Sequence, residues 1–239
     1  MLDSDNAVKR LHRIAAKLGP RDGPVPAILG QALDADPTKV EFHLRMALFI
    51  RTVEEAREQI QALSGDPNRD LFLAAVENIS QKLNEVDLRE NWGRYGSVFD
   101  TRAITLLELC SRAIEHRQTV APPTAEGIQS VLEEVLAARE ALEAADIEED
   151  ARKLLLDMLR DVERALLAYE ISGLSGLRRA VERTVGAAIL NQRELEPSRS
   201  NAAVKQVFSA LGKALALAKS VDFVRQLPEK VQQWLELGP

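Results

Sequence analysis

The sequence predicts an all-α protein, a multi-helix bundle of about eight to ten helices without a strand. Three observations support this fold class. Ala, Leu, Glu and Arg, which favour helices, dominate the chain, whereas aromatic residues make up only 4% of it. Apolar residues recur at steps of three and four, which places them on one face of a helix. The prolines fall between these periodic segments, at their starts or at the end of the chain.

The first expected helices lie within the first 86 residues. One runs from Ser4 or Asp5 to Leu18, and a short one over 27–33 follows the loop GPRDGPVP. Asp36-Pro37 and Asp66-Pro67 each place an N-cap acceptor before a proline, so they predict helices over 37–63 and 67–86. The expected core face of the helix over 37–63 consists of Met46, Phe49, Ile50, Val53, Ile60 and Leu63.

Residues 87–98, DLRENWGRYGSV, interrupt the helical pattern and concentrate aromatic and arginine side chains in a loop. Two interpretations are open. Trp92, Arg94 and Tyr95 form a hot spot for a protein partner, since Trp, Tyr and Arg are enriched at such sites. Alternatively, the two rings anchor the loop between helices with their polar tips directed towards solvent.

A proline-containing linker marks the expected domain boundary. A helix starting at Asp100 or Thr101 and ending at His116 precedes the segment QTVAPPTAEG, in which Thr124 is placed to cap the next helix. We therefore expect an N-terminal helical region over 1–120 and a C-terminal bundle over 121–239. A single continuous bundle with a loop at this point is the alternative.

The segment from Asp146 to Asn191 carries the strongest helical pattern. Asp146 and Glu149 fit a capping box at its start. Its apolar stripes are Leu155, Leu159, Val162, Leu166 and Tyr169, followed by Leu174, Leu177, Val181, Val185 and Ala188. We expect two antiparallel helices joined at Ser172–Ser175, with Gly173 as a left-handed cap. One long helix is the alternative, although each interior glycine costs about 1 kcal/mol.

The C-terminal part combines an amphipathic helix with a short final segment. The helix over 201–221 has apolar residues at steps of four and three and bears Lys205, Lys213 and Lys219. In the final segment, Trp234 shares a face with two other apolar residues. Trp234 joins the candidate partner-binding residues, and the three lysines are candidates for contact with an anionic membrane.

The charge distribution constrains the partners. The net charge of −6 argues against general binding of nucleic acid. Residues 121–196 contain sixteen acidic and nine basic side chains, whereas residues 197–239 contain three and six. This asymmetry indicates either that the tail packs on the acidic region or that it forms a surface for an anionic partner.

Sequence signatures of catalysis and of cofactor or metal binding are not found. The glycines form neither a phosphate-binding loop nor a dinucleotide fingerprint. The histidines at 12, 43 and 116 lack the spacing of metal-ligand pairs, so we predict no metal, cofactor or catalytic residue. The single cysteine, Cys110, is expected to be a small buried apolar residue and fits a reducing compartment.

The favoured functional hypothesis is a non-enzymatic, cytoplasmic helical protein that acts by binding a protein partner or by homo-oligomerisation. A membrane-acting effector that uses the basic C-terminal helix is the first alternative. A helical enzyme or a small-molecule binder without a short motif is the second.

Overall fold

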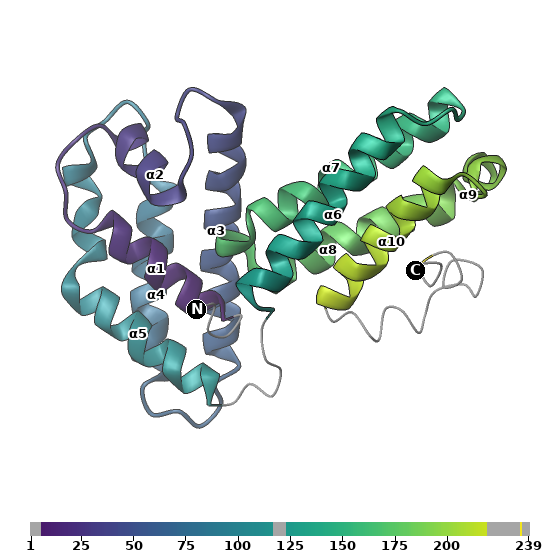
Figure 1. The fold of residues 1–239 in the computed structure, drawn as a ribbon. Helices are drawn as coiled ribbons and strands as arrows, with labels where there is room; N and C mark the ends of the chain where they lie inside the picture. Colours follow the sequence, from purple (N-terminus) through teal and green to yellow (C-terminus); the bar gives the residue numbers. More distant parts are fainter. Residues whose placement is uncertain (1–5, 117–122, 219–234, 236–239) are drawn as a thin grey trace. The chain divides into compact units, whose positions relative to one another are not determined.

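The computed structural model describes residues 6–116, 123–218 and 235. Within these ranges it contains ten α-helices and three short 3₁₀-helices but no strand (Figure 1). The all-α fold class expected from the sequence is therefore confirmed.

The chain divides into two compact units. Of the described residues, 6–116 and the distant segment Glu170–Gly173 belong to the N-terminal unit. Of the described residues, 123–169, 174–218 and 235 belong to the C-terminal unit. Four residues that lie far along the chain thus belong to the N-terminal unit, which the sequence does not predict.

Five α-helices build the N-terminal unit: α1 (Ala7–Leu18), α2 (Val25–Leu33), α3 (Val40–Gln61), α4 (Arg69–Asn84) and α5 (Thr101–Glu115). Helix α1 packs against both α3 and α5, and α3 also packs against α4. The largest fully buried side chains of this core are Trp92, Tyr95, Phe42, Phe49, Phe99, Leu11, Leu18, Leu29, Leu33, Ile60 and Ile79. Most of the aromatic rings of the chain are therefore concentrated in this unit.

Side-chain caps fix two of these helix starts. The Asn6 side chain accepts hydrogen bonds from the backbone N–H groups of Val8 and Lys9, at 2.9 and 3.3 Å. Asp100 accepts from the N–H of Ala103 at 2.8 Å and caps α5, as the sequence predicts. Each acceptor satisfies N–H groups that the first helical turn leaves without a partner.

The two Asp-Pro starts expected for α3 and α4 are too early. Asp36 accepts hydrogen bonds from the N–H and the hydroxyl of Thr38, and this forms a turn. Asp66 likewise accepts from the N–H two residues further on. The helices begin only after these turns, at Val40 and at Arg69. An Asp side chain accepts from the N–H two residues on both in such a turn and at a helix cap, so the Asp-Pro pattern does not fix the residue at which the helix begins.

Trp92 anchors the loop before α5. This region forms two 3₁₀-helices, η1 (Trp92–Arg94) and η2 (Gly96–Phe99). The Trp92 indole stacks on Phe99 with ring centroids 5.5 Å apart, and its Nε1–H donates to the carbonyl oxygen of Gly19 at 3.1 Å. The Trp92 backbone N–H donates to the carbonyl of Gly23 at 2.8 Å. One residue therefore joins this loop to the loop after α1.

Replacing Trp92 by alanine is expected to lower the free energy of unfolding of the N-terminal unit by about 3–5 kcal/mol. The change removes a fully buried ring and leaves the Gly19 carbonyl without its donor. A urea titration followed by circular dichroism measures the effect. Arg94→Ala, in the same loop but at an exposed side chain, is the control and should change stability by no more than about 0.5 kcal/mol. Equal stabilities of the two variants would contradict the anchoring role.

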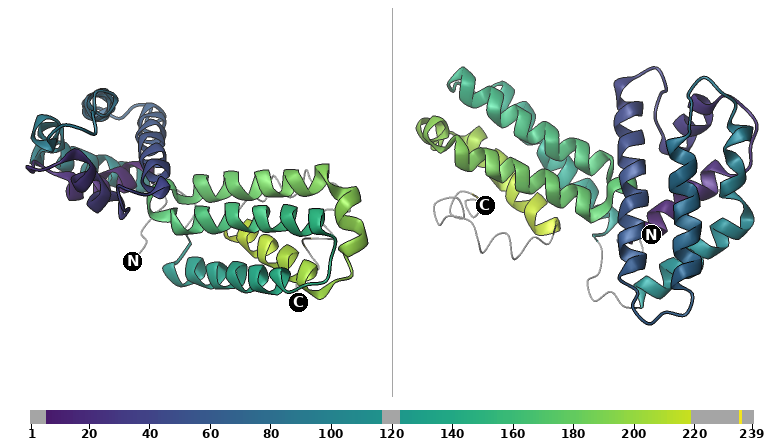
Figure 2. Two further views of the ribbon diagram at one scale, coloured as in Figure 1. Left: turned by 90° about the horizontal axis from the view of Figure 1, so that it is seen from above. Right: turned by 180° about the vertical axis from the view of Figure 1, so that it is seen from behind.

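The C-terminal unit is built from α6 (Ala125–Glu143), α7 (Glu149–Leu167), α8 (Tyr169–Leu190), the short α9 (Gln192–Leu195) with η3 (Glu196–Ser198), and α10 (Ala202–Leu217). Figure 2 shows α6, α7 and α8 lying side by side. Its core is almost entirely aliphatic and includes Leu155, Leu159, Val162, Leu166, Leu177, Val181, Val185, Val204, Phe208, Leu211 and Leu215. These residues belong to the apolar stripes expected from the sequence.

The capping box predicted at the start of α7 is wrong. Glu148 occupies the N-cap position and makes no side-chain cap hydrogen bond. Glu149 accepts instead from Arg152 at 2.7 Å. This i,i+3 ion pair competes with the reach of Glu149 back to Asp146, which the box requires.

Gly173 breaks the helix that follows α7. Its backbone has φ 58° and ψ −160°, a conformation essentially restricted to glycine. Helices α7 and α8 run in opposite directions (Figure 2), so two helices are confirmed and the single long helix is excluded, but α7 already ends at Leu167, before the junction expected at Ser172–Ser175. The value of ψ is extended, however, and Gly173 is therefore not the left-handed helical cap that we expected.

Candidate functional site

The structure places the two aromatic residues of the predicted hot spot inside the protein. Trp92 is fully buried and Tyr95 is 1% exposed. The Tyr95 hydroxyl donates to Glu90 and accepts from the N–H of Asp87 at 3.1 Å. Both rings belong to the core and anchor the loop, as in the second interpretation, but the Trp92 N–H bonds the Gly19 carbonyl inside the protein and is not directed towards solvent.

Only Arg94 of this loop group is exposed. Its guanidinium pairs with Glu90 and lies 5.9 Å from the centre of the Tyr95 ring. The hydrogen bond to the Glu90 carboxylate raises the pKa of Tyr95, because ionisation of the phenol would place two negative charges together. Glu90 therefore joins Arg94 and Tyr95 in one polar network beside the buried rings of this loop.

The C-terminal candidates are only partly described. Trp234 and Lys219 lie outside the described residues. Lys205 is exposed, and Lys213 forms an ion pair with Glu134 of α6 at 2.8 Å. The apolar face of α10 packs against α6 and α7 and is buried in the core of its unit. In this structure α10 therefore has no apolar face exposed to a bilayer.

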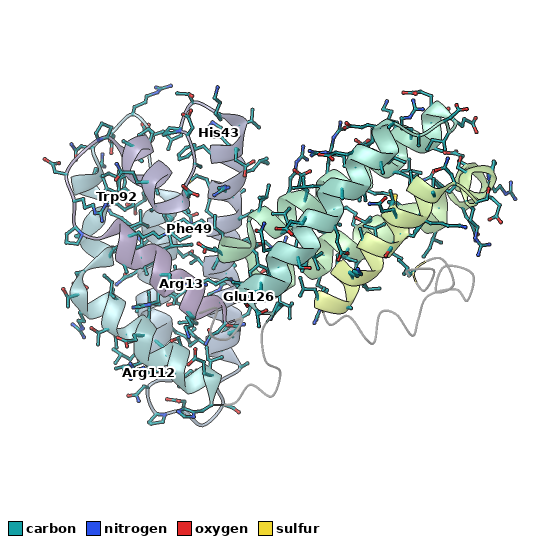
Figure 3. The ribbon with its side chains drawn as sticks, viewed as in Figure 1. Arg13, His43, Phe49, Trp92, Arg112 and Glu126 are labelled. Atoms are coloured by element: carbon teal, nitrogen blue, oxygen red, sulfur yellow. The ribbon has the colours of Figure 1, made fainter. Side chains whose placement is uncertain are left out.

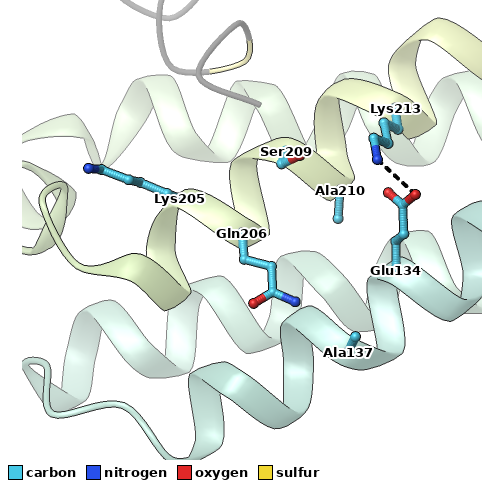
Figure 4. Close-up of a pocket in the computed structure, with 7 residues that line it drawn as sticks. All are labelled: Glu134, Ala137, Lys205, Gln206, Ser209, Ala210 and Lys213. Atoms are coloured by element: carbon cyan, nitrogen blue, oxygen red, sulfur yellow. Dashed lines mark hydrogen bonds and ion pairs between the residues drawn. The ribbon is translucent and has the colours of Figure 1, made fainter. Parts of the chain in front are cut away.

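A shallow groove lies between α6 and α10 (Figure 4). It encloses about 480 Å³ and is lined by Glu134, Ala137, Lys205, Gln206, Ser209, Ala210 and Lys213. The ammonium of Lys213 is directed towards the Glu134 carboxylate, so these two charges compensate each other, and Lys205 is the third charged side chain of the lining. The lining mixes small and polar side chains and selects no particular ligand chemistry.

A second groove of about 300 Å³ lies between α4 and the start of α5. It is lined by Leu71, Ala74, Ala75, Asn78, Ser97, Val98, Asp100, Arg102, Ala103 and Leu106. Leu71 is 42% exposed at its rim. The Asp100 carboxylate already accepts the hydrogen bond from the backbone N–H of Ala103 that caps α5.

The most exposed apolar surface along a single helix lies on the first half of α3. Val40 is 74% exposed, Leu44 45% and Ile50 41%, and Ala47 between them is also exposed. These four residues recur at steps of four, three and three and therefore lie along one side of the helix. We call them the α3 stripe. His43, labelled in Figure 3, is exposed on the same side of the helix, three residues after Val40 and seven before Ile50.

Helix α3 is apolar on two sides. Its opposite face is in the core, where Phe42, Phe49, Val53, Ala56 and Ile60 are buried. The prediction that Ile50 belongs to the core face is therefore wrong. Ile50 follows Phe49 directly, and a step of one residue turns a side chain by about 100° around the helix axis, out of the core. In the sequence, the apolar residues of this helix already cover more of its circumference than a single core-facing side can bury.

The single thiol is buried in the N-terminal unit. Cys110 of α5 is fully inaccessible. Burial, with a smaller contribution from the Asp66 carboxylate, raises the pKa of the Cys110 thiol to about 12. A thiol that stays protonated is a poor nucleophile, so Cys110 behaves as the buried apolar residue that the sequence predicts.

Within the described ranges, no group of three or more His, Cys, Asp or Glu side chains is arranged to hold a metal ion. Among the same residues, no helix is both long enough and apolar enough to cross a membrane. No protein-family model, curated protein or solved structure matches this chain.

The pKa of Cys110 predicts a pH dependence of stability. The thiol ionises near pH 9 when the chain is unfolded and near 12 when it is folded. Stability from the protonated thiol is therefore fully present below pH 9 and is lost as the pH rises towards 12. Between about pH 8 and about pH 10.5, the urea midpoint of the wild type should fall further than that of Cys110→Ala. Equal falls would show that the thiol ionises as readily in the folded protein.

Proposed function

We propose that this protein is a non-enzymatic binding protein whose α3 stripe docks a helix of a protein partner. The observation that carries the proposal is the exposure of Val40, Leu44, Ala47 and Ile50 along one side of a helix whose other side is already buried. A surface helix normally exposes a polar face. Contiguous apolar residues on that face favour a binding role.

The dimensions of the α3 stripe suit a helical partner. Ten residues separate Val40 from Ile50, which corresponds to about 15 Å along the axis, or close to three turns. A partner helix with apolar residues at the same spacing packs ridges into grooves against such a surface. Ala47 lies near the middle of the stripe, where a small side chain allows the two helix backbones to approach closely.

The charges beside the α3 stripe favour a protein over a lipid surface. Arg45 pairs with Glu41 at 3.0 Å, and Arg51 pairs with Glu55 at 3.4 Å. Helices that lie in anionic membranes usually carry a predominantly basic polar face. A border with both signs of charge is typical of the polar rim of a protein interface.

Replacing Leu44 by glutamate is expected to weaken partner binding by at least tenfold, because it places a charge in the centre of the apolar contact. The purified wild type and variant are compared as baits in extract of the cells that make the protein. The retained protein is then purified, and its dissociation constant is measured by titration. Loss of binding should occur without a change in helicity by circular dichroism.

Leu109→Glu is the matched control. Leu109 is 50% exposed on α5, so the control has the same substitution and a similar exposure at a site away from the α3 stripe. A partner retained by the wild type and the control but not by Leu44→Glu supports the proposal. Equal retention by all three contradicts it. A Leu44-dependent dimer in sedimentation equilibrium would identify the partner as a second copy, and Leu44-dependent co-sedimentation with anionic liposomes in place of protein binding would also contradict the proposal.

A further inference from the structure

The segment Glu170–Gly173 fills a site in the core of the N-terminal unit. Ile171 is 5% exposed and belongs to the same apolar cluster as the faces of α1, α3 and α5. Ser172 is 4% exposed and Gly173 is also buried. The two helices that flank this segment in the chain, α7 and the greater part of α8, belong to the C-terminal unit.

Two buried side chains of the N-terminal unit lie within hydrogen-bond distance of the carbonyl oxygen of Ile171. Arg10 of α1 donates from Nε at 3.0 Å. Thr52 of α3 has its hydroxyl 2.7 Å from the same oxygen and 2.9 Å from the carbonyl of Leu48, and it can donate its single hydrogen to one of them. Arg10 is 2% exposed and Thr52 1% exposed, so this is a polar site formed within the core.

Arg10 is held in position by an acid on α3. Its Nη2 donates to Glu55 Oε2 at 2.9 Å, and the two side chains are 3% and 17% exposed. A buried guanidinium is destabilising unless its charge is paired and its N–H groups are bonded. The Ile171 carbonyl supplies one of the acceptors that this charge requires, so removing the segment leaves a buried donor to be satisfied by water or by a rearrangement.

We infer that the Arg10–Thr52 site is a latch that is filled in cis by Ile171. The N-terminal unit reaches its closed, protected state only while the connection between α7 and α8 is seated in this site. The positive φ of Gly173 is the backbone condition for seating, because it redirects the chain immediately after the segment. When the segment leaves, the N-terminal core loses the Ile171 side chain, the hydrogen bond from Arg10 and the contact of the Thr52 hydroxyl with the same carbonyl in one step.

Gly173→Ala tests the latch through a thiol in another helix. The added methyl group disfavours the φ of 58° without altering Arg10, Thr52 or Ile171. Cys110 is fully buried in the N-terminal unit and reacts with a disulfide reagent such as DTNB only when this unit opens. The rate of Cys110 labelling under native conditions should rise by about tenfold or more in Gly173→Ala.

Gly186→Ala is the matched control. It is the same substitution in the same helix, at a glycine without positive φ and with nothing within 4 Å of the added carbon. Its Cys110 labelling rate should equal that of the wild type or be lower. Labelling of Gly173→Ala at the rate of Gly186→Ala would overturn the inference.

A pair of variants at Thr52 covers the case in which Gly173→Ala fails to fold. Thr52→Val keeps the shape of the side chain and removes the donor, so Cys110 labelling should accelerate by about fivefold or more. Thr52→Ser restores the hydroxyl, so its Cys110 labelling rate should return most of the way to that of the wild type. Equal labelling rates for Val and Ser would show that the hydrogen bond to Ile171 does not hold the unit closed.

Discussion

The N-terminal unit depends on the burial of one face of α3. This helix packs against α1, α2, α4 and α5, and its residues Phe42, Phe49 and Ile60 lie in the centre of the core. The same helix supplies Thr52 and Glu55 to the site that holds Ile171. A helix of 22 residues with this many neighbours determines where each of them lies.

The proposed function rests on the α3 stripe, the exposed apolar side of this helix. Once Phe42 and Phe49 are fixed in the core, the helical repeat places Val40, Leu44 and Ala47 on another side of the helix, which leaves them exposed. Exposing an apolar side chain instead of burying it forgoes about 25 cal/mol for each Å² of apolar surface. A partner helix would recover that free energy by covering the stripe.

The two units are stabilised by different side chains. The N-terminal core stacks aromatic rings, with Trp92, Tyr95 and Phe99 close together. The C-terminal core is mostly aliphatic, and alanines such as Ala138, Ala210 and Ala214 allow α6 and α10 to pack closely. The Arg10–Ile171 contact adds a polar requirement to the N-terminal core that neither type of packing implies.

Local periodicity explains what the sequence could predict. The stripes of α7 and α10 follow from steps of three and four, and Leu159 and Leu211 are indeed fully buried. The caps at Asp100 and Thr124 depend on neighbouring residues only and were also predicted correctly. Asp36 was misassigned because an acid before a proline fits a turn as well as a helix cap.

Contacts between distant residues explain what the sequence could not predict. The burial of Trp92 depends on Gly19, 73 residues earlier, and the hydrogen bond between Ile171 and Arg10 spans 161 residues. Contacts between residues so far apart in the chain produce no periodic pattern in the sequence. For α3, the excess of apolar residues was visible, but periodicity alone could not decide which side would face the core, and Ile50 was placed on the wrong one.

Site-specific photo-crosslinking from α3 tests the central claim most directly. A benzophenone amino acid replaces His43, which is exposed beside the α3 stripe, and in the control it replaces Glu77, which is exposed on α4. Irradiation of the cells that make the protein should yield a discrete adduct from position 43 and none from position 77. No adduct from either position, or the same adduct from both, would contradict a binding role for this face of α3.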